Sequence, residues 1–228
     1  MLRIALSSFL VGCTFADWAQ IKDDFAIAAN SSGFRTLTQV DMDKVSEYGC
    51  WCYFEGHHGM GRGKPNDAID SQCKILHDGY ECAIMDGMLE NYECEPWTVS
   101  YASATGLGFG QKEMSHIQDE CIANNPEDDK CAQRACMVEG WFVVEMFSLF
   151  VGGEAVDESM RHANGFDRIE DCPINSDPTL KSDKSCCGVY PIRYPFKNFE
   201  GERACCGTST YNANVLTCCD DGKAKMNC

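Results

Sequence analysis

Cysteine content constrains this chain more than any other feature. The sequence of 228 residues carries 17 cysteines, far above ordinary usage. Such a density is typical either of a disulfide-stabilised protein from an oxidising compartment or of a metal-rich intracellular protein. Three pairs of cysteines are adjacent in the sequence, and adjacent cysteines do not easily bond to each other. We therefore expect each doubled pair to reach two partners and to join short segments: Cys186-Cys187, Cys205-Cys206 and Cys218-Cys219.

The first residues decide between the two compartments. The stretch MLRIALSSFLVGCTFA has a basic Arg3, then an apolar run, then the small residues Thr14 and Ala16. This pattern predicts a secretory signal peptide over residues 1–16, cut after Ala16. Cleavage would remove Cys13 and leave sixteen cysteines, an even number suited to eight disulfides. No later apolar run lasts the ~18 residues that a membrane span needs, and we expect a secreted, extracellular protein.

Charge divides the remaining chain into two modules. The formal net charge is -16, which argues against nucleic acid as a partner because a phosphate backbone attracts basic surfaces. Residues 17–163 hold 26 acids and 10 bases, whereas residues 164–228 hold 9 acids and 8 bases, and each part carries eight cysteines. The first part shows helical patterns and the second is rich in turns. The sequence therefore predicts a signal peptide at 1–16, a helical domain at 17–163 and a cysteine-rich module at 164–228.

The predicted fold class is mainly α and disulfide-rich, with a small module of irregular or β structure at the C-terminal end. Apolar residues recur at helical spacing in three segments, which run over about 18–29, 66–88 and 129–150. The last is apolar on most sides, and we expect it to be central. Residues 91–120 favour a loop, with a small hairpin as an option.

Residues that could carry chemistry concentrate between positions 48 and 82. A loop with four glycines, Gly56, Gly59, Gly61 and Gly63, precedes a helix that carries His77-Asp78. Glycines let backbone carbonyls converge on a hard cation, and a carboxylate from a neighbouring helix would complete such a site. A histidine one residue before that carboxylate projects about 100° away around the helix. The pattern predicts calcium-assisted hydrolysis, with His77 as general base and Asp78 as calcium ligand.

These stretches resemble the signature of the secreted phospholipase A2 family. The resemblance rests on Tyr48-Gly49-Cys50-Trp51-Cys52, on GRGKPNDAID at 61–70, and on Cys73 followed by His77-Asp78. It covers residues 48–82 strongly and 17–150 loosely. A second match is similar to the later cysteine helix of that family: Cys121, Asn124, Cys131, Cys136 and Glu139.

The resemblance implies hydrolysis of the sn-2 ester of a glycerophospholipid at a membrane surface or micelle, with Ca²⁺ as cofactor. Glu139 stands where the family has an aspartate that accepts a hydrogen bond from the catalytic histidine. Calcium would be held by Asp78 and by loop carbonyls near Trp51, Tyr53 and Gly56 or Gly59. The loop departs from the family, because eight residues, 53–60, replace the usual three.

Two aromatic residues are further candidates for contacts with the site or with lipid. Tyr101 is a further candidate hydroxyl for the site, although it does not align with the family. Trp18, in the first predicted helix, either contacts lipid or belongs to the core.

The resemblance also implies three disulfides, Cys52–Cys73, Cys94–Cys131 and Cys121–Cys136. Cys50 and Cys82 are then left either to pair with each other or to reach the C-terminal module. Two places where the family has bonded cysteines hold Tyr80 and Val138 here. The paired absence is what a relative that has lost one bridge should show.

The C-terminal module is similar to galaxin-type repeats of secreted matrix proteins, through Cys186-Cys187-Gly188, Cys205-Cys206-Gly207 and Thr210-Tyr211-Asn212. This similarity implies a possible extracellular matrix contact. It supports an alternative function, in which the chain is a catalytically weak or inactive protein on a phospholipase scaffold. Such a protein would act as an acidic, calcium-binding component of an extracellular or biomineral matrix.

Overall fold

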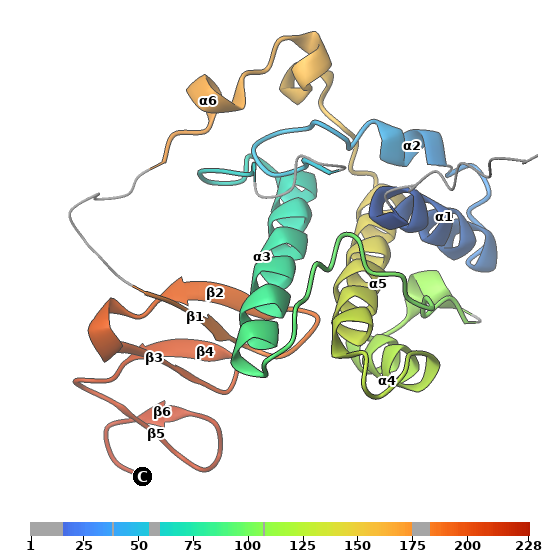
Figure 1. Cartoon of the computed structure of the whole chain (residues 1–228). Helices are drawn as coiled ribbons and strands as arrows, with labels where there is room; N and C mark the ends of the chain where they lie inside the picture. The colour runs from blue at the N-terminus through green and yellow to red at the C-terminus, as the bar shows by residue number, and fades with distance from the viewer. Residues whose placement is uncertain (1–15, 38, 55–59, 107, 175–182) are drawn as a thin grey trace, which may run out of the picture.

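The protein is disulfide-rich and mainly α-helical, with three short β-hairpins toward its C-terminal end (Figure 1). The computed structural model describes residues 16–37, 39–54, 60–106, 108–174 and 183–228. Apart from Ala16, the predicted signal peptide and Cys13 lie outside the described residues. Among those residues, no helix is both long enough and apolar enough to cross a membrane.

Two long helices lie side by side at the centre of the fold (Figure 1). Helix α3 spans Ala68–Leu89 and α5 spans Lys130–Val151, close to the predicted 66–88 and 129–150. Each begins just after an aspartate that caps it, because the side chains of Asp67 and Asp129 accept backbone N–H groups of the first turn. Helix α5 is central, as predicted, since α1, α3 and α4 all contact it.

The first helix, α1, spans Ala16–Ser31 and packs across α5. Phe25 of α1 meets the rings of Phe147 and Phe150 of α5 edge-on, with centroids 6.4 and 5.8 Å apart. A short helix, α2, follows at Gln39–Asp43. The prediction of a helix at 18–29 is therefore confirmed, whereas α2 carries too few residues to show a periodic pattern.

The hairpin considered for residues 91–120 is wrong. The described part of this segment holds a 3-10 turn, η1, at Phe109–Gln111 and a helix, α4, at Met114–Asn124, and no strand. Only Ile117 and Cys121 of α4 are buried. Helical periodicity is therefore weak, and the packing of these two residues against α5 determines the conformation.

The described residues after position 182 form three antiparallel hairpins. Strand β1 (Lys184–Cys187) pairs with β2 (Tyr194–Lys197), β3 (Arg203–Cys206) with β4 (Ser209–Asn212), and β5 (Thr217–Cys218) with β6 (Ala224–Lys225). Short turns lie before and between them: η2 (Glu158–Met160), η3 (His162–Asn164), α6 (Arg168–Asp171) and η4 (Phe199–Gly201).

Eight disulfides join the sixteen cysteines of the described residues. The three pairs expected from the resemblance, Cys52–Cys73, Cys94–Cys131 and Cys121–Cys136, are present. Cys50 and Cys82 take the second of their two alternatives and reach toward the C-terminal end, as Cys50–Cys172 and Cys82–Cys186.

The doubled cysteines each reach two partners, as expected. In β1 and β3, successive side chains point to opposite faces, which allows one cysteine of each pair to bond an earlier segment and the other a later one. Three further bonds run through the module: Cys187–Cys205, Cys206–Cys218 and Cys219–Cys228. They stabilise hairpins that bury few apolar residues.

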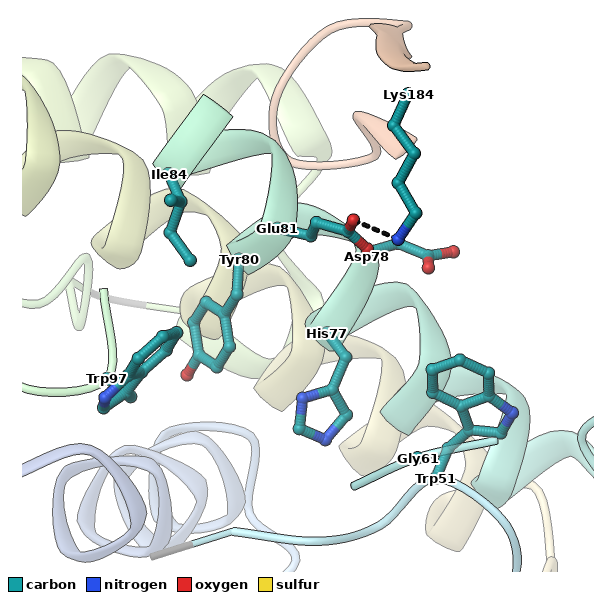
Figure 2. A pocket seen from close by; sticks show the side chains of 9 residues that line it. All are labelled: Trp51, Gly61, His77, Asp78, Tyr80, Glu81, Ile84, Trp97 and Lys184. Atoms are coloured by element: carbon teal, nitrogen blue, oxygen red, sulfur yellow. Dashed lines mark hydrogen bonds and ion pairs between the residues drawn. The ribbon is translucent and has the colours of Figure 1, made fainter. Parts of the chain in front are cut away.

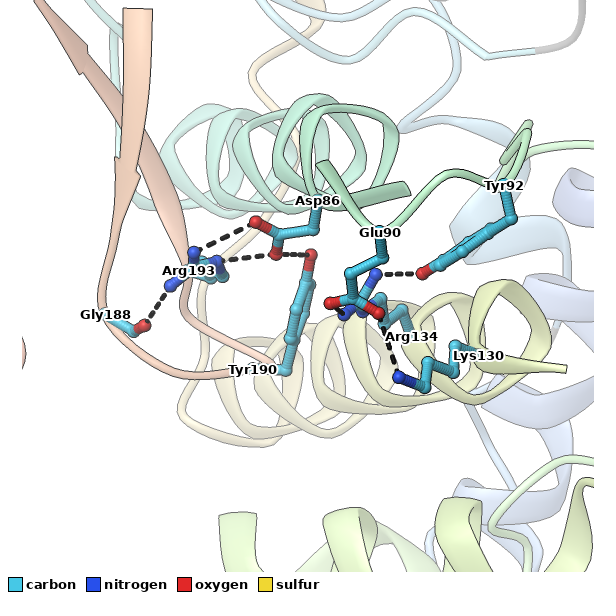
Figure 3. A network of polar contacts seen from close by, with 8 residues as sticks. All are labelled: Asp86, Glu90, Tyr92, Lys130, Arg134, Gly188, Tyr190 and Arg193. Carbon is cyan, nitrogen blue, oxygen red and sulfur yellow. Dashed lines mark hydrogen bonds and ion pairs between the residues drawn. The ribbon is translucent and has the colours of Figure 1, made fainter. Parts of the chain in front are cut away.

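A polar network holds the first hairpin against α3 (Figure 3). Asp86 of α3 accepts two hydrogen bonds from Arg193, at 2.8 and 3.0 Å, and one from the Tyr190 hydroxyl, at 2.8 Å. The guanidinium of Arg134, from α5, lies 5.4 Å from the centre of the Tyr190 ring. Together with the Cys82–Cys186 bond, this network fixes β1 and β2 relative to α3.

One buried carboxyl lies apart from these contacts. Asp24 of α1 is 1% exposed and accepts a hydrogen bond from Gln20 at 3.1 Å. Removal from water raises the pKa of Asp24 from 3.8 to about 6, against the opposing effect of hydrogen bonds from Ser103 and Gln20.

This shift makes stability depend on pH. Because the folded-state pKa is the higher one, the folded protein binds more protons, and its stability should fall as pH rises from about 4 to about 6. Asp24→Asn should therefore stabilise the protein at pH 7 by about 3 kcal/mol, since each pKa unit is equivalent to about 1.4 kcal/mol. The gain should be small at pH 4, because Asp24 is then neutral in the folded protein and near the midpoint of its ionisation in the unfolded chain.

Chemical denaturation at pH 4 and pH 7 measures both differences. Asp119→Asn on α4 is the matched control, because Asp119 is exposed, and it should change stability by no more than about 0.5 kcal/mol. A gain from Asp24→Asn that is the same at both pH values would contradict the raised pKa.

Candidate functional site

A pocket of about 300 Å³ lies beside the middle of α3 (Figure 2). Its walls come from three parts of the chain: α3, the loops that carry the aromatic side chains, and strand β1 of the C-terminal module. The lining residues are Trp51, Gly61, His77, Asp78, Tyr80, Glu81, Ile84, Trp97 and Lys184. Two of the residues predicted from sequence to carry chemistry, His77 and Asp78, therefore lie in the same pocket.

His77 lies in an aromatic environment and is 8% exposed. Its ring is stacked on Phe54, with centroids 6.0 Å apart, and meets the edge of Tyr80 at 6.1 Å. Trp18 of α1 in turn stacks on Phe54, with ring centroids 4.1 Å apart. Trp18 is 3% exposed, so that it belongs to the core rather than to a lipid-contacting surface. These rings limit the access of water to His77.

Asp78 faces cations rather than aromatic rings. It forms an ion pair with Lys74, one helical turn earlier, and its side chain is 15% exposed. Burial raises the pKa of Asp78, whereas the charges of Lys74 and, to a lesser extent, Lys184 act in the opposite direction. The two neighbours on α3 thus project to different environments, as expected for successive positions of a helix.

Glu139 of α5 is fully buried and is held by two tyrosine hydroxyls. Tyr80 donates to Oε1 at 2.8 Å, and Tyr101 donates to Oε2. Tyr80 also contacts the ring of His77, so that one side chain touches both His77 and Glu139. The contribution of Tyr101 agrees with its place as a candidate hydroxyl, whereas Tyr80 stands where the family has a cysteine.

The loop before α3 is anchored by Asp70, whose role the sequence did not reveal. Asp70 is fully buried and accepts the backbone N–H groups of Cys50 and Trp51, at 3.0 and 2.7 Å. Gly49 has φ +58°, and a Cβ there would lie 2.6 Å from the Asp70 carboxyl carbon. Glycine at this position therefore permits the close approach on which the anchor depends.

The predicted calcium ligands are placed unequally. The ring of Trp51 lines the pocket, but its carbonyl accepts the Tyr53 N–H at 2.8 Å. The side chain of Tyr53 lies elsewhere, with its ring 4.9 Å from the Arg168 guanidinium. Gly56 and Gly59 fall in residues 55–59, outside the described residues. Of the predicted set, Asp78 and Trp51 are the ones that the structure places at the pocket.

The residues around Asp78 can hold a hard cation if the cation displaces Lys74 from the carboxylate. Within the described part of the chain, no three His, Cys, Asp or Glu side chains are grouped to hold a metal, so backbone carbonyls would supply most oxygen ligands. The Asp78 carboxylate is partly buried and needs a positive partner. Lys74 now fills that role, with its ammonium 4.9 Å from the centre of the Trp51 ring. Calcium would therefore compete with Lys74.

Sequence reasoning missed the ion-pair partner of Asp78 and three residues that line the pocket, for different reasons. Lys74 lies four residues before Asp78, the spacing of a helical ion pair, and this signal was available. Lys184, Glu81 and Trp97 gave no signal, because they meet at the pocket through the packing of the whole chain.

Comparison with known proteins adds no family. No protein-family model matches the chain, and no curated protein matches it.

The buried carboxylate of Glu139 gives a test of the site's construction. Tyr80→Phe and Tyr101→Phe each remove one phenol donor from a buried acid. Each should lower the free energy of unfolding by about 1.5–3 kcal/mol, the range for hydrogen bonds to charged groups.

Tyr194→Phe is the control, since its hydroxyl only meets the Thr208 carbonyl at 3.4 Å on an exposed surface. It should change stability by no more than about 0.5 kcal/mol, measured by chemical denaturation. If Tyr101→Phe is no more destabilising than this control, the hydroxyl does not support Glu139.

Proposed function

We propose that this chain is a secreted, calcium-dependent esterase of the phospholipase A2 type. It would cleave the sn-2 ester of glycerophospholipids at a membrane surface or micelle. The observation that carries the proposal is the position of His77 beside Asp78 in one pocket. Support also comes from the Cys52–Cys73 bond, which joins the preceding loop to the same helix, as the resemblance implies.

His77 would act as the general base. It would take a proton from a water molecule whose oxygen attacks the sn-2 carbonyl carbon. The tetrahedral intermediate would then collapse, and the leaving lysophospholipid oxygen would receive the proton back from His77. Water is thereby divided between the two products, a fatty acid and a lysophospholipid. Aromatic shielding of His77 by Phe54 and Tyr80 suits a base that must admit one water molecule and exclude bulk solvent.

Two acids would support this step in different ways. Glu139, fixed by the hydroxyls of Tyr80 and Tyr101, would orient the histidine and favour the tautomer that can accept a proton. Asp78 and backbone carbonyls of the loop would hold calcium. When bound, calcium would supply electrostatic stabilisation of the charge that develops on the ester oxygen.

The alternative function is favoured by a different observation. Because Lys74 already neutralises Asp78, calcium binding at the pocket would be weak. A chain with net charge -16 could still attract calcium over its acidic surface as a matrix component. The two functions are separated by whether hydrolysis depends on His77 and whether calcium depends on Asp78.

One test of the esterase function concerns the general base, His77. His77→Gln should lower the esterase rate on phosphatidylcholine micelles by about 10²–10⁴-fold. His116→Gln is the matched control, because His116 is exposed on α4, and its rate should equal that of the unaltered protein. Near-ultraviolet circular dichroism checks that both variants are folded. Equal activity of the two variants would place the chemistry elsewhere.

Another test concerns calcium binding at Asp78. Lys74→Met should strengthen calcium binding roughly three- to tenfold, because it removes a competing ion pair that stabilises by about 1 kcal/mol. Asp78→Asn should weaken binding sharply. Calorimetric titration with calcium chloride measures both.

Lys22→Met is the control for the loss of one positive charge, since Lys22 pairs with Asp43 at 2.9 Å, away from the pocket. If Lys22→Met strengthens binding as much as Lys74→Met, the effect is one of overall charge. If Asp78→Asn leaves binding unchanged, calcium is attracted to the acidic surface and the matrix function gains support.

A further inference from the structure

The pocket that holds His77 contains one lysine that does not belong to the helical domain. Lys184 opens strand β1 and reaches the pocket from the C-terminal module (Figure 2). It forms an ion pair with Glu81 of α3, and the two side chains are 54% and 36% exposed. The appended module therefore contributes a positive charge to a site whose other walls come from residues 51–97.

The position of Lys184 is fixed by the contacts of its strand. Two residues after it, Cys186 is bonded to Cys82 of α3, with Cα atoms 5.8 Å apart. Lys184 pairs with Lys197 of β2 in the register of the hairpin. Arg193, the residue just before β2, binds Asp86 of α3 (Figure 3). The base of the side chain is thus held by a covalent bond and a charged network, while its ammonium lies at the pocket mouth.

The ion pair with Glu81 does not prevent Lys184 from binding a ligand. Exposed ion pairs of this kind contribute little to stability, so an anionic group can replace Glu81 at small cost. A lysine ammonium is a compact charge that binds phosphate oxygens well. The whole chain carries a net charge of -16, which disfavours anions, and Lys184 places a positive charge at the pocket.

The opposite wall of the pocket is apolar. Ile84 and Trp97 line it, together with the ring of Tyr80. A second hollow shares Ile84 and Trp97 and continues to Met88, near the end of α3. Met88 is 71% exposed. The ligand that matches both walls carries a phosphate beside an apolar chain.

We propose that Lys184 binds the phosphate of a glycerophospholipid at the mouth of the His77 pocket, so that the C-terminal module forms part of the substrate site. This inference deepens the proposed esterase function and rests on it for the identity of the ligand. Lys184 selects the ligand and takes no part in proton transfer.

The test is a binding experiment that needs no hydrolysis. The probe is 1,2-dihexyl-sn-glycero-3-phosphocholine, an ether lipid, used below its micelle concentration in buffers with calcium and with chelator. Binding is followed by tryptophan fluorescence, because Trp51 and Trp97 line the pocket. Lys184→Gln should weaken binding about tenfold, the effect of losing one charged contact, and Lys184→Arg should largely restore it.

Three controls make the result specific. Lys225→Gln removes a charge from the same module, where Lys225 pairs with Asp221 at 2.6 Å, and should leave binding unchanged. 1,2-Dihexylglycerol, which lacks the phosphate, should bind the unaltered protein and Lys184→Gln equally. Glu81→Gln should strengthen binding of the phospholipid, because it removes the competing carboxylate.

Several results would overturn the proposal. One is equal weakening of the charged and neutral probes by Lys184→Gln. Another is full recovery in the double variant Lys184→Gln/Glu81→Gln, which would assign the loss to repulsion by Glu81. Displacement of the lipid by millimolar inorganic phosphate would indicate a site for free anions.

The inference and the proposed function can fail separately. Absence of any fluorescence change in the unaltered protein would overturn the inference, while the micelle assay with His77→Gln tests catalysis on its own. Lipid binding that depends on Lys184 in a protein without esterase activity would overturn the catalytic function and leave the phosphate site in place.

Discussion

Two disulfides on α3 determine the construction of the candidate site. Cys73 bonds Cys52 of the preceding loop, and Cys82 bonds Cys186 of the C-terminal module. His77 and Asp78 lie between these two cysteines on the same helix. One bond brings the loop with Trp51 to the pocket, and the other brings the strand that begins at Lys184. Both walls therefore depend on covalent bonds to a single helix, which restrict how far each wall can move from it.

Successive positions of α3 give the pocket two chemical environments. His77 points into aromatic rings, where Phe54 and Tyr80 shield it, whereas Asp78 points toward Lys74 and Lys184. The rotation of about 100° per residue produces this separation without any loop. A histidine shielded by aromatic rings and a charge-compensated carboxylate can therefore lie side by side. The same arrangement explains why a cation at Asp78 must compete with a residue of the same helix.

The C-terminal module contributes more than a cap. Its first hairpin is held by Arg193 and Tyr190 on Asp86, and the remaining hairpins are joined to it by disulfides. Disulfides supply most of the folding stability of the C-terminal module, since few of its side chains are buried. A module that is stable for this reason can present exposed charges such as Lys184 without the need to bury them.

Elements that depend on local signals could be predicted from the sequence. Periodic apolar residues located the three long helices, capping aspartates lie at the starts of α3 and α5, and adjacent cysteines in a strand had to take separate partners. The resemblance also anticipated three of the disulfides. These features follow from chemistry that lies within a few residues, or from a motif of known spacing.

The remaining features depend on contacts between distant parts of the chain. The sequence left Cys50 and Cys82 with two alternatives, because disulfide connectivity depends on which cysteines folding brings within about 6 Å. It suggested a hairpin near α4, where only Ile117 and Cys121 are buried, since so short a buried face carries no clear period. It gave no sign that Tyr80 holds Glu139 or that Lys184 meets Glu81. Those contacts join positions 59 and 103 residues apart, and distances of that kind are set by packing rather than by local sequence.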